Sequence, residues 1–278
     1  MLKEINVALA QIDCRVGDKE HNLRVMERHI RQAKQKDTNL VVFPELALTG
    51  YMCRDLVYEL AEPIPQGESI RRLEELTKKE HMYAVFGMLE RSEKARATLY
   101  NTAVLLGPRG FIGKYRKTHL PTHSAFEEKR YFRLGYQAPV FETDIGRLGL
   151  IVCYDVFFPE ITRLLRLKGS QLIVCISASP AVRREFFETL TVARAIENTA
   201  YLVYVNLVGV EDGLQFWGGS RIVAPNGKII SQAKYDEEDL VIGRIDYADL
   251  ERTETFVPVL RDLRPEFFDF LKEQVENL

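Results

Sequence analysis

The sequence predicts an α/β fold in which short buried strands alternate with amphipathic helices. The clearest sign is the run from Leu148 to Val152, a short apolar segment of the kind found in strands buried on both faces. An apolar stripe at helical spacing begins soon afterwards at Ile161. Strand and helix patterns then alternate again up to Asn206, and 278 residues can bury a large α/β core.

The bulk composition is that of a globular protein, with 46% hydrophobic and 28% charged residues and a net charge of −2. We see no basic run for nucleic acid, no apolar stretch long enough to span a membrane, and no secretory cleavage pattern. The four cysteines lack metal-type spacing. We therefore expect a cytoplasmic protein with free thiols, without a metal or cofactor and without a nucleic-acid or membrane partner.

In the first half of the chain we expect strands over residues 5–10, 40–43, 82–89 and 99–106. Helices are expected over residues 19–33 and 68–80, because apolar side chains recur there every three or four positions. The segment 107–110 has the composition of a hairpin turn.

In the second half we expect strands over 171–177, 201–206 and 239–245, and a hairpin of 220–224 with 228–232. A helix over 185–198 would carry a stripe of Phe186, Leu190, Ala193 and Ile196. The tail 256–271 mixes apolar and charged residues and shows no clear apolar face. Because we find no repeat or low-complexity linker, we expect a single domain over residues 1–278.

Three positions could carry chemistry. Cys153 follows a buried strand at a strand-to-helix turn, where it could be a nucleophile or a buried structural thiol. Glu45 follows another buried strand and could be a solvated loop acid or a base with a tuned pKa. Lys117 ends a cluster of cations that could be a surface patch or a fixed positive charge in a site.

With their contexts, these positions resemble the carbon–nitrogen hydrolases of the nitrilase superfamily. The matching blocks are Val42-Phe43-Pro44-Glu45-Leu46, Tyr115-Arg116-Lys117-Thr118-His119-Leu120, Cys153-Tyr154-Asp155, Ser177-Ala178-Ser179-Pro180 and Ala193-Arg194-Ala195-Ile196-Glu197-Asn198. Within that superfamily the chain resembles the glutaminase domain of glutamine-dependent NAD synthetases, through His119-Leu120-Pro121 and the segment from Phe126 to Phe132.

The resemblance implies a four-layer αββα sandwich and a defined set of catalytic residues. Cys153 is the implied nucleophile, and Glu45 is the implied general base. Lys117 and the N–H of Tyr154 would stabilise an oxyanion. Glu128 stands where the family has a second glutamate, for which we expect an orienting role, with acid/base catalysis as the alternative. Lys114 and Glu127 are the alternatives to Lys117 and Glu128.

The implied reaction is hydrolysis of a small linear amide through a Cys thioester, with glutaminase-like activity as one form. A nitrile hydrolase or an N-carbamoyl amine hydrolase would use the same catalytic trio of Glu45, Lys117 and Cys153. A catalytically idle binding subunit is the alternative outside enzymes. Residues near the trio are expected to shape the substrate pocket: Tyr51, His123, Phe126, Tyr154, Phe157 and Ser177.

The resemblance also implies partners. We expect a homodimer or a higher homo-oligomer, with residues of about 250–278 contributing to the interface. A separate synthetase that accepts the released ammonia is a further expected partner if the chain is a glutaminase subunit. Synthetase-type blocks differ from this chain at His123 and after Pro180, where Arg183 or Arg184 could bind a substrate carboxylate or simply start a surface helix.

Overall fold

Two six-stranded β-sheets face each other in the computed structural model, which describes residues 2–277. The first sheet has the order β14-β1-β2-β3-β4-β5. Its strands are β1 (Glu4–Gln11), β2 (Leu40–Val42), β3 (Tyr83–Arg91), β4 (Leu99–Gly107), β5 (Gly110–Arg116) and β14 (Asp239–Asp246). β1, β2 and β3 are parallel, and the outer strands pair antiparallel.

The second sheet has the order β13-β12-β9-β8-β7-β6 and the same plan. Its strands are β6 (Val140–Thr143), β7 (Gly146–Val152), β8 (Leu172–Ser177), β9 (Tyr201–Asn206), β12 (Arg221–Val223) and β13 (Ile229–Gln232). The central strands β7, β8 and β9 are parallel. In each sheet the ends of parallel strands therefore lie at one edge, where α/β proteins commonly place their sites.

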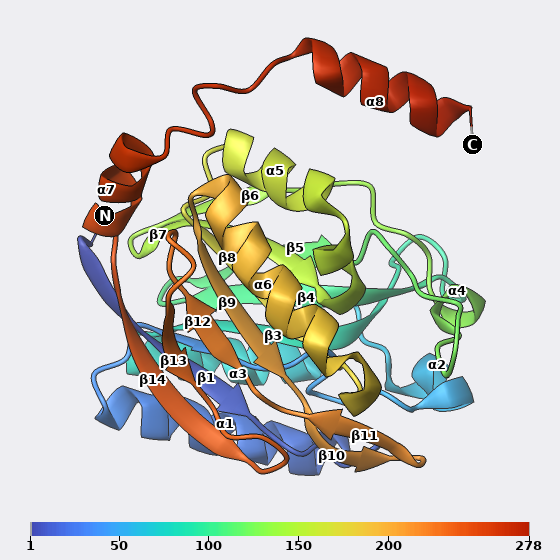
Figure 1. Cartoon of the computed structure of the whole chain (residues 1–278). Helices are drawn as coiled ribbons and strands as arrows, with labels where there is room; N and C mark the ends of the chain where they lie inside the picture. Colours follow the sequence, from blue (N-terminus) through green and yellow to red (C-terminus); the bar gives the residue numbers. More distant parts are fainter. Residues whose placement is uncertain (1, 278) are drawn as a thin grey trace.

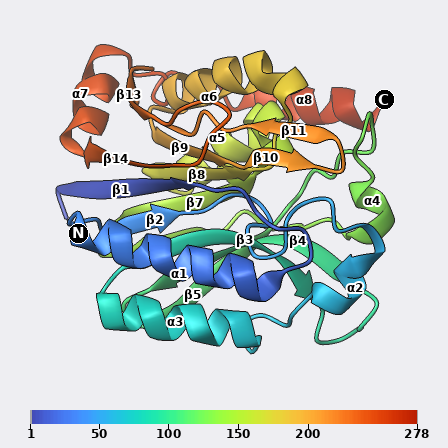
Figure 2. The same ribbon diagram turned by 90° about the horizontal axis from the view of Figure 1, so that it is seen from below.

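Helices cover the two outer faces, so the layers run αββα (Figure 2). α1 (Lys19–Gln35) and α3 (Glu68–Glu80) lie on the first sheet, and α5 (Pro159–Leu167) and α6 (Arg184–Asn198) lie on the second. Side chains alternate along β1: Val7 and Leu9 belong to the core between the sheets, whereas Ala8 and Ala10 pack towards α1 and α3. The four-layer sandwich implied by the sequence is confirmed.

The buried face of α6 differs from the expected stripe. Phe186 and Ile196 are 50% and 46% exposed, and the buried side chains lie one position further round the helix. Among these, Arg194 donates to the carbonyl of Val156, and Asn198 donates to Thr162 Oγ1. Hydrogen bonding of polar groups thus selects the inner face, and periodicity of apolar residues alone could not reveal this.

Several short elements lie outside the main layers. A hairpin of β10 (Val208–Glu211) and β11 (Leu214–Trp217) extends beyond the sheets, and α2 (Val57–Leu60) and α4 (Glu128–Tyr131) flank the same end of the molecule (Figure 1). Three short 3₁₀ turns complete the list: η1 (Arg54–Leu56), η2 (Cys153–Phe157) and η3 (Ala181–Arg183). The expected hairpin turn over 107–110 joins β4 to β5, whereas the β10–β11 hairpin and β6 were not expected from the sequence.

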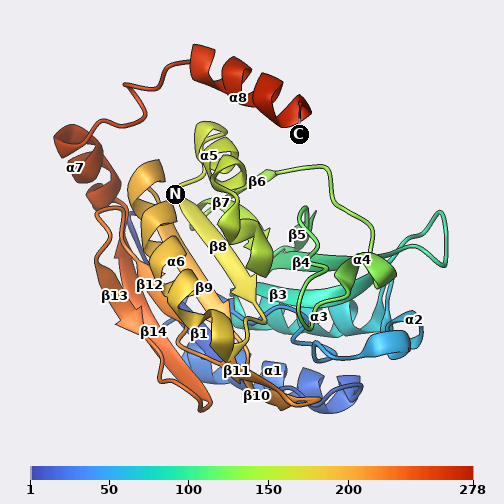
Figure 3. The same ribbon diagram turned by 45° about the vertical axis from the view of Figure 1, so that its right-hand side comes forward.

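The tail contains two helices, α7 (Ala248–Phe256) and α8 (Glu266–Glu276). α8 stands away from the sandwich at the end of an extended segment, on the side of α5 (Figures 1 and 3). Among residues 2–277 we find no helix whose length and apolar character would let it cross a membrane.

Candidate active site

Glu45 lies fully buried in the turn that follows β2. Its Oε1 accepts hydrogen bonds from Asn101 Nδ2 at 2.6 Å and from Lys117 Nζ at 2.7 Å. Its Oε2 accepts from the main-chain N–H of Ala178 at 2.8 Å. A buried carboxylate needs such partners, and these three hold both oxygens in place.

The backbone of the Glu45 turn lies directly against β3 at Gly87. A Cβ at Gly87 would come within 2.3 Å of Leu46 N and 2.7 Å of Glu45 Cα. Glycine is therefore required at this position by the close approach of two main chains. Leu46 has a φ of 49°, so the turn also uses a backbone conformation that L-residues rarely adopt.

Lys117, just after β5, lies between two carboxylates. Its Nζ is 2.7 Å from Glu45 Oε1 and 2.6 Å from Glu128 Oε1, and its side chain is inaccessible to solvent. Burial lowers the pKa of the ammonium, but Glu128 and Glu45 outweigh that effect and raise the pKa above its usual value. Lys117 is therefore a permanent cation. Lys114 instead pairs with Glu90 at 2.7 Å.

Glu128, the first residue of α4, completes the cluster. Its Oε1 accepts from Tyr51 Oη at 2.7 Å as well as from Lys117. Burial and the neighbouring Glu45 raise the pKa of Glu128 to about 7, against the opposing effect of Lys117. Its Oε2 is buried and has no hydrogen-bond partner among the described residues. The adjacent Glu127 is exposed.

Cys153 begins the η2 turn immediately after β7. Its φ is 48°, a strained value for a residue other than glycine. Burial and Glu45 raise the pKa of the thiol above its ordinary value, whereas Lys117 lowers it. The sulfur is therefore a thiol at neutral pH, and it lies within electrostatic reach of both Glu45 and Lys117.

Asp155 ties the Cys153 turn to the segment that carries Lys117. Its carboxylate accepts from Val152 N at 3.0 Å and from Tyr115 Oη at 2.8 Å. It also accepts from Thr118 Oγ1 and from the N–H of His119, both at 2.9 Å. This fully buried group thus links the second sheet to the first.

A cavity of about 300 Å³ opens above Cys153. Phe126, Tyr154, Phe157 and Phe187 give it aromatic walls, and His123 and Arg183 also line it. The structure therefore places four of the six expected pocket residues around the sulfur. Ser177 is fully buried at the end of β8 and is not among the residues that line this cavity, but its hydroxyl lies close enough to the Cys153 thiol to lower the pKa of that thiol by hydrogen bonding.

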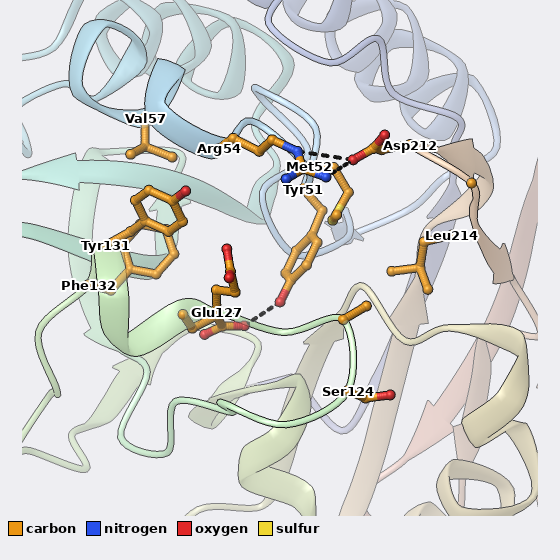
Figure 4. A pocket seen from close by; sticks show the side chains of 13 residues that line it. Tyr51, Met52, Arg54, Val57, Ser124, Glu127, Tyr131, Phe132, Asp212 and Leu214 are labelled. Atoms are coloured by element: carbon orange, nitrogen blue, oxygen red, sulfur yellow. Dashed lines mark hydrogen bonds and ion pairs between the residues drawn. The ribbon is translucent and has the colours of Figure 1, made fainter.

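Tyr51 lines a second cavity, of about 370 Å³, on the Glu128 side of the cluster (Figure 4). Figure 4 shows Tyr51 pointing down towards its carboxylate partner, with the ion pair of Arg54 and Asp212 at the opposite rim. The main-chain N–H groups of Tyr51 and Met52 both donate to Glu211 Oε2 at 2.8 Å. Burial raises the pKa of Glu211 to about 7.

Sequence reasoning missed Glu211, Asn101 and the linking role of Asp155. Asn101 interrupts an otherwise apolar strand, and Asp155 lies in a block that was recognised, so both carried a local signal. Glu211 precedes Asp212-Gly213, a strong two-residue hairpin signal that could have revealed β10 and β11.

Residues 6–255 match the family model of the carbon–nitrogen hydrolases. The chain belongs to the carbon–nitrogen hydrolase family. A nitrilase of Pyrococcus abyssi is 36% identical over 95% of this chain and 99% of its own length. The glutamine-dependent NAD(+) synthetase of Aquifex aeolicus is 32% identical over 89% of this chain, which spans 43% of that protein.

Solved carbon–nitrogen hydrolases share the architecture. The enzyme from Helicobacter pylori G27 superposes with a TM-score of 0.89 at 28% identity, covering 96% of this chain and 98% of that one. An amidase mutant from Nesterenkonia sp. AN1 has a TM-score of 0.82 at 28% identity, with 95% of both chains covered. Its structure shows covalent addition of the acetamide moiety of fluoroacetamide at the active site cysteine.

Proposed function

We propose that this carbon–nitrogen hydrolase cleaves a small linear amide through a thioester on Cys153. The observation that carries the proposal is the buried contact between Glu45 and Lys117 beside the thiol. A base and a permanent cation placed together next to a cysteine can create a thiolate and stabilise the charge that forms after its attack.

The first half-reaction begins with the thiol. Because the pKa of Cys153 is raised, its proton moves to Glu45 as the sulfur attacks the carbonyl carbon. The C–S bond forms, and the carbonyl oxygen becomes an oxyanion held by Lys117 and the N–H of Tyr154. As the oxyanion collapses, the C–N bond breaks and the proton on Glu45 passes to the leaving nitrogen. Ammonia or an amine departs and a thioester remains.

The second half-reaction uses water. Glu45, again a carboxylate, takes a proton from a water molecule that attacks the thioester carbon. A second oxyanion forms in the same place and collapses with cleavage of the C–S bond. The acid is released, and the proton returns from Glu45 to the sulfur. Glu128 keeps Lys117 oriented through both steps by its contact of 2.6 Å.

The adduct on the active site cysteine of the related amidase supports this assignment for a family member of the same fold. Nitrile hydrolysis is the second candidate, because the relative from Pyrococcus abyssi is named a nitrilase. The same trio would serve N-carbamoyl amines. Delivery of ammonia to a separate synthetase remains a prediction.

The test is release of ammonia or amine from a panel of amides, nitriles and N-carbamoyl amines. We expect release from short amides and a transient mass increase on Cys153 upon brief exposure to substrate, equal to the acyl group. Cys153→Ala should abolish both signals. Cys14→Ala, the same change at a buried cysteine outside the cavity, serves as the matched control. Absence of turnover and of any adduct across the panel would favour an idle binding subunit.

We also propose that the protein is a homodimer. Leu164 and Leu167 of α5 and Phe186 and Ile196 of α6 are each about half exposed on one outer face. α8 adds Phe267, Phe268, Phe270, Leu271 and Val275. Half-exposed apolar side chains gathered on helices of one side are typical of a protein–protein interface, and a second copy of this chain is the partner we propose.

A further inference from the structure

The β10–β11 hairpin carries a buried carboxylate that no step of the proposed reaction uses. Glu211 is the last residue of β10 and is 4% exposed. One of its oxygens, Oε2, accepts the main-chain N–H groups of both Tyr51 and Met52 at 2.8 Å. Burying a carboxylate is costly unless it is hydrogen-bonded. This pair of contacts therefore ties the loop at 50–52 to the hairpin.

The loop packs directly against the hairpin at its main chain and at the ring of Tyr51. Gly50 has a φ of +77°, and a Cβ on it would lie 2.9 Å from Val16 Cα and 3.3 Å from Glu211 Oε1. The main chain of the loop thus passes close to the carboxylate. Phe216 of β11 meets the ring of Tyr51 edge to face, with 6.0 Å between the ring centroids. The hairpin therefore fixes both the origin and the direction of the Tyr51 side chain.

The far end of Tyr51 lies on the catalytic cluster (Figure 4). Its hydroxyl donates at 2.7 Å to Glu128 Oε1, the same oxygen that accepts from Lys117 at 2.6 Å. Burial and Glu128 raise the pKa of the Tyr51 phenol well above its ordinary value, so the hydroxyl remains a donor. This hydrogen bond favours the charged form of Glu128. A line of contacts thus runs from Glu211 through Tyr51 to the carboxylate that holds Lys117.

We propose that Glu211 is a positioning residue that holds the Tyr51 hydroxyl on Glu128. The hydroxyl then keeps the Glu128 carboxylate charged and in contact with Lys117. The proposal rests on the amide hydrolysis proposed above and adds a residue to its supporting structure. Glu211 is not among the residues that line either cavity, so it acts through Tyr51 and not on the substrate.

The test is the pH–rate profile of Glu211→Leu, Glu211→Gln and Tyr51→Phe. Leucine offers no acceptor, so the loop should loosen and the hydrogen bond to Glu128 should be lost. We expect kcat to fall about tenfold with little change in KM, and the rise in kcat/KM near pH 7 to move up by about one pH unit, as loss of one charge-assisted hydrogen bond would cause. Glu211→Gln keeps an acceptor oxygen and should restore both values. Tyr51→Phe should reproduce the shift, and adding Glu211→Leu to it should change little further.

Glu62→Leu is the matched control, because Glu62 is also buried and accepts a main-chain N–H, that of Ser69 at 3.0 Å, outside both cavities. It should lower Tm and leave the transition in place. The pKa of Glu128 can also be measured without turnover, by NMR of protein labelled with ¹³C in the glutamate side-chain carboxyls. The signal of Glu128 is identified by its loss in Glu128→Gln, and in Glu211→Leu it should titrate about one pH unit higher.

Gly50→Ala displaces the loop without changing the carboxylate, since its Cβ would crowd Val16 and Glu211. It should raise the Glu128 transition as well, and it serves as the test if Glu211→Leu does not fold. An unmoved transition in these variants, an equal shift in Glu62→Leu, or additive shifts in the double variant with Tyr51→Phe would overturn the positioning role. A shift seen by NMR in a protein that turns over no amide would support that role and count against the proposed reaction alone.

Discussion

At the scale of single residues, the site depends on two backbone turns with strained residues and on the glycine at position 87. Cys153 and Leu46 have φ values of 48° and 49°. Such conformations cost on the order of 1–2 kcal/mol each in residues with a Cβ. Cys153 directly follows β7, and Leu46 lies in the turn after β2 next to Glu45, so both are at the points where the thiol and the Glu45 carboxylate are presented. The strain is therefore concentrated where the chemistry is proposed.

Gly87→Ala should inactivate the enzyme by shifting the Glu45 turn, and not through any contact of residue 87 with the substrate. The new Cβ would lie within 3 Å of main-chain atoms of Glu45 and Leu46, so the Glu45 turn must shift. We expect kcat to fall by at least about 10²-fold, since small displacements of a catalytic group have effects of that order. The measurement is steady-state kinetics together with circular dichroism, to show that the variant is folded.

Gly213→Ala is the matched control, because a Cβ at Gly213 would meet nothing within 4 Å, although its φ of +80° adds strain. It should lower stability and leave kcat within a few-fold of the wild type. An active Gly87→Ala variant would contradict the view that this contact positions Glu45.

Glu128 should give the activity an ionisation near neutral pH. Its pKa is raised to about 7 by burial and Glu45, and the charged form is the one that holds Lys117. We therefore expect kcat/KM to rise with pH through about 7. Glu128→Gln should lower the rate and remove this transition, which a pH–rate profile would show. A transition of unchanged position in the variant would assign it to another group.

The same shift has a consequence for stability with a defined sign. A carboxyl whose pKa is higher in the folded state than its usual 4.5 binds its proton more tightly when folded. Its contribution to the free energy of unfolding is therefore present at low pH, and it is lost as the pH rises from about 4.5 to 7. Glu128→Gln should make this part of the stability curve flatter in urea titrations.

At the scale of elements, the site is assembled by contacts between segments that are distant in sequence. The turn η2 presents Cys153, and the segment after β5 presents Lys117. Asp155 joins them, and Glu211 on β10 holds the loop that contains Tyr51. Each link is a buried carboxylate that accepts several hydrogen bonds, so each fixes the spacing of two elements at once.

Asp155→Asn should loosen the link between η2 and the Lys117 segment. An amide cannot accept from all four donors, because one end of it is itself a donor. We expect a loss of about 1–3 kcal/mol in the free energy of unfolding, together with a fall in kcat larger than the change in KM. Thermal unfolding and kinetics measure the two effects. A variant that is destabilised but keeps full kcat would show that Asp155 only supports the fold.

At the scale of the whole molecule, the apolar surface over α5, α6 and α8 predicts self-association. Light scattering should give the mass of two 32.0 kDa chains. Leu164→Glu should shift the population towards the monomer, because it puts a charge on the α5 face that lines one cavity together with Phe268 and Leu271. Val210→Glu, an equivalent change on the remote β10 hairpin, should not. A wild-type monomer at micromolar concentration would contradict this proposal.

Sequence patterns predicted the central strands and the long helices because these elements are buried and strongly periodic. The same patterns could not predict the buried face of α6. Apolar residues such as Phe186 are exposed there, whereas Arg194 and Asn198 point inward and form hydrogen bonds. The trio could be proposed from sequence blocks. The burial of Ser177 beside the Cys153 thiol could not, because it depends on how the end of β8 packs against the turn after β7.

The distribution of the catalytic trio over two sheets determines how the enzyme can lose its activity. Glu45 and Lys117 follow strands of the first sheet, whereas Cys153 follows a strand of the second. Slippage of one layer over the other by a fraction of an ångström would separate base from sulfur while secondary structure persists. The catalytic rate therefore depends sensitively on the alignment of the two sheets. Moderate hydrostatic pressure should abolish turnover at pressures well below those that change the circular dichroism signal.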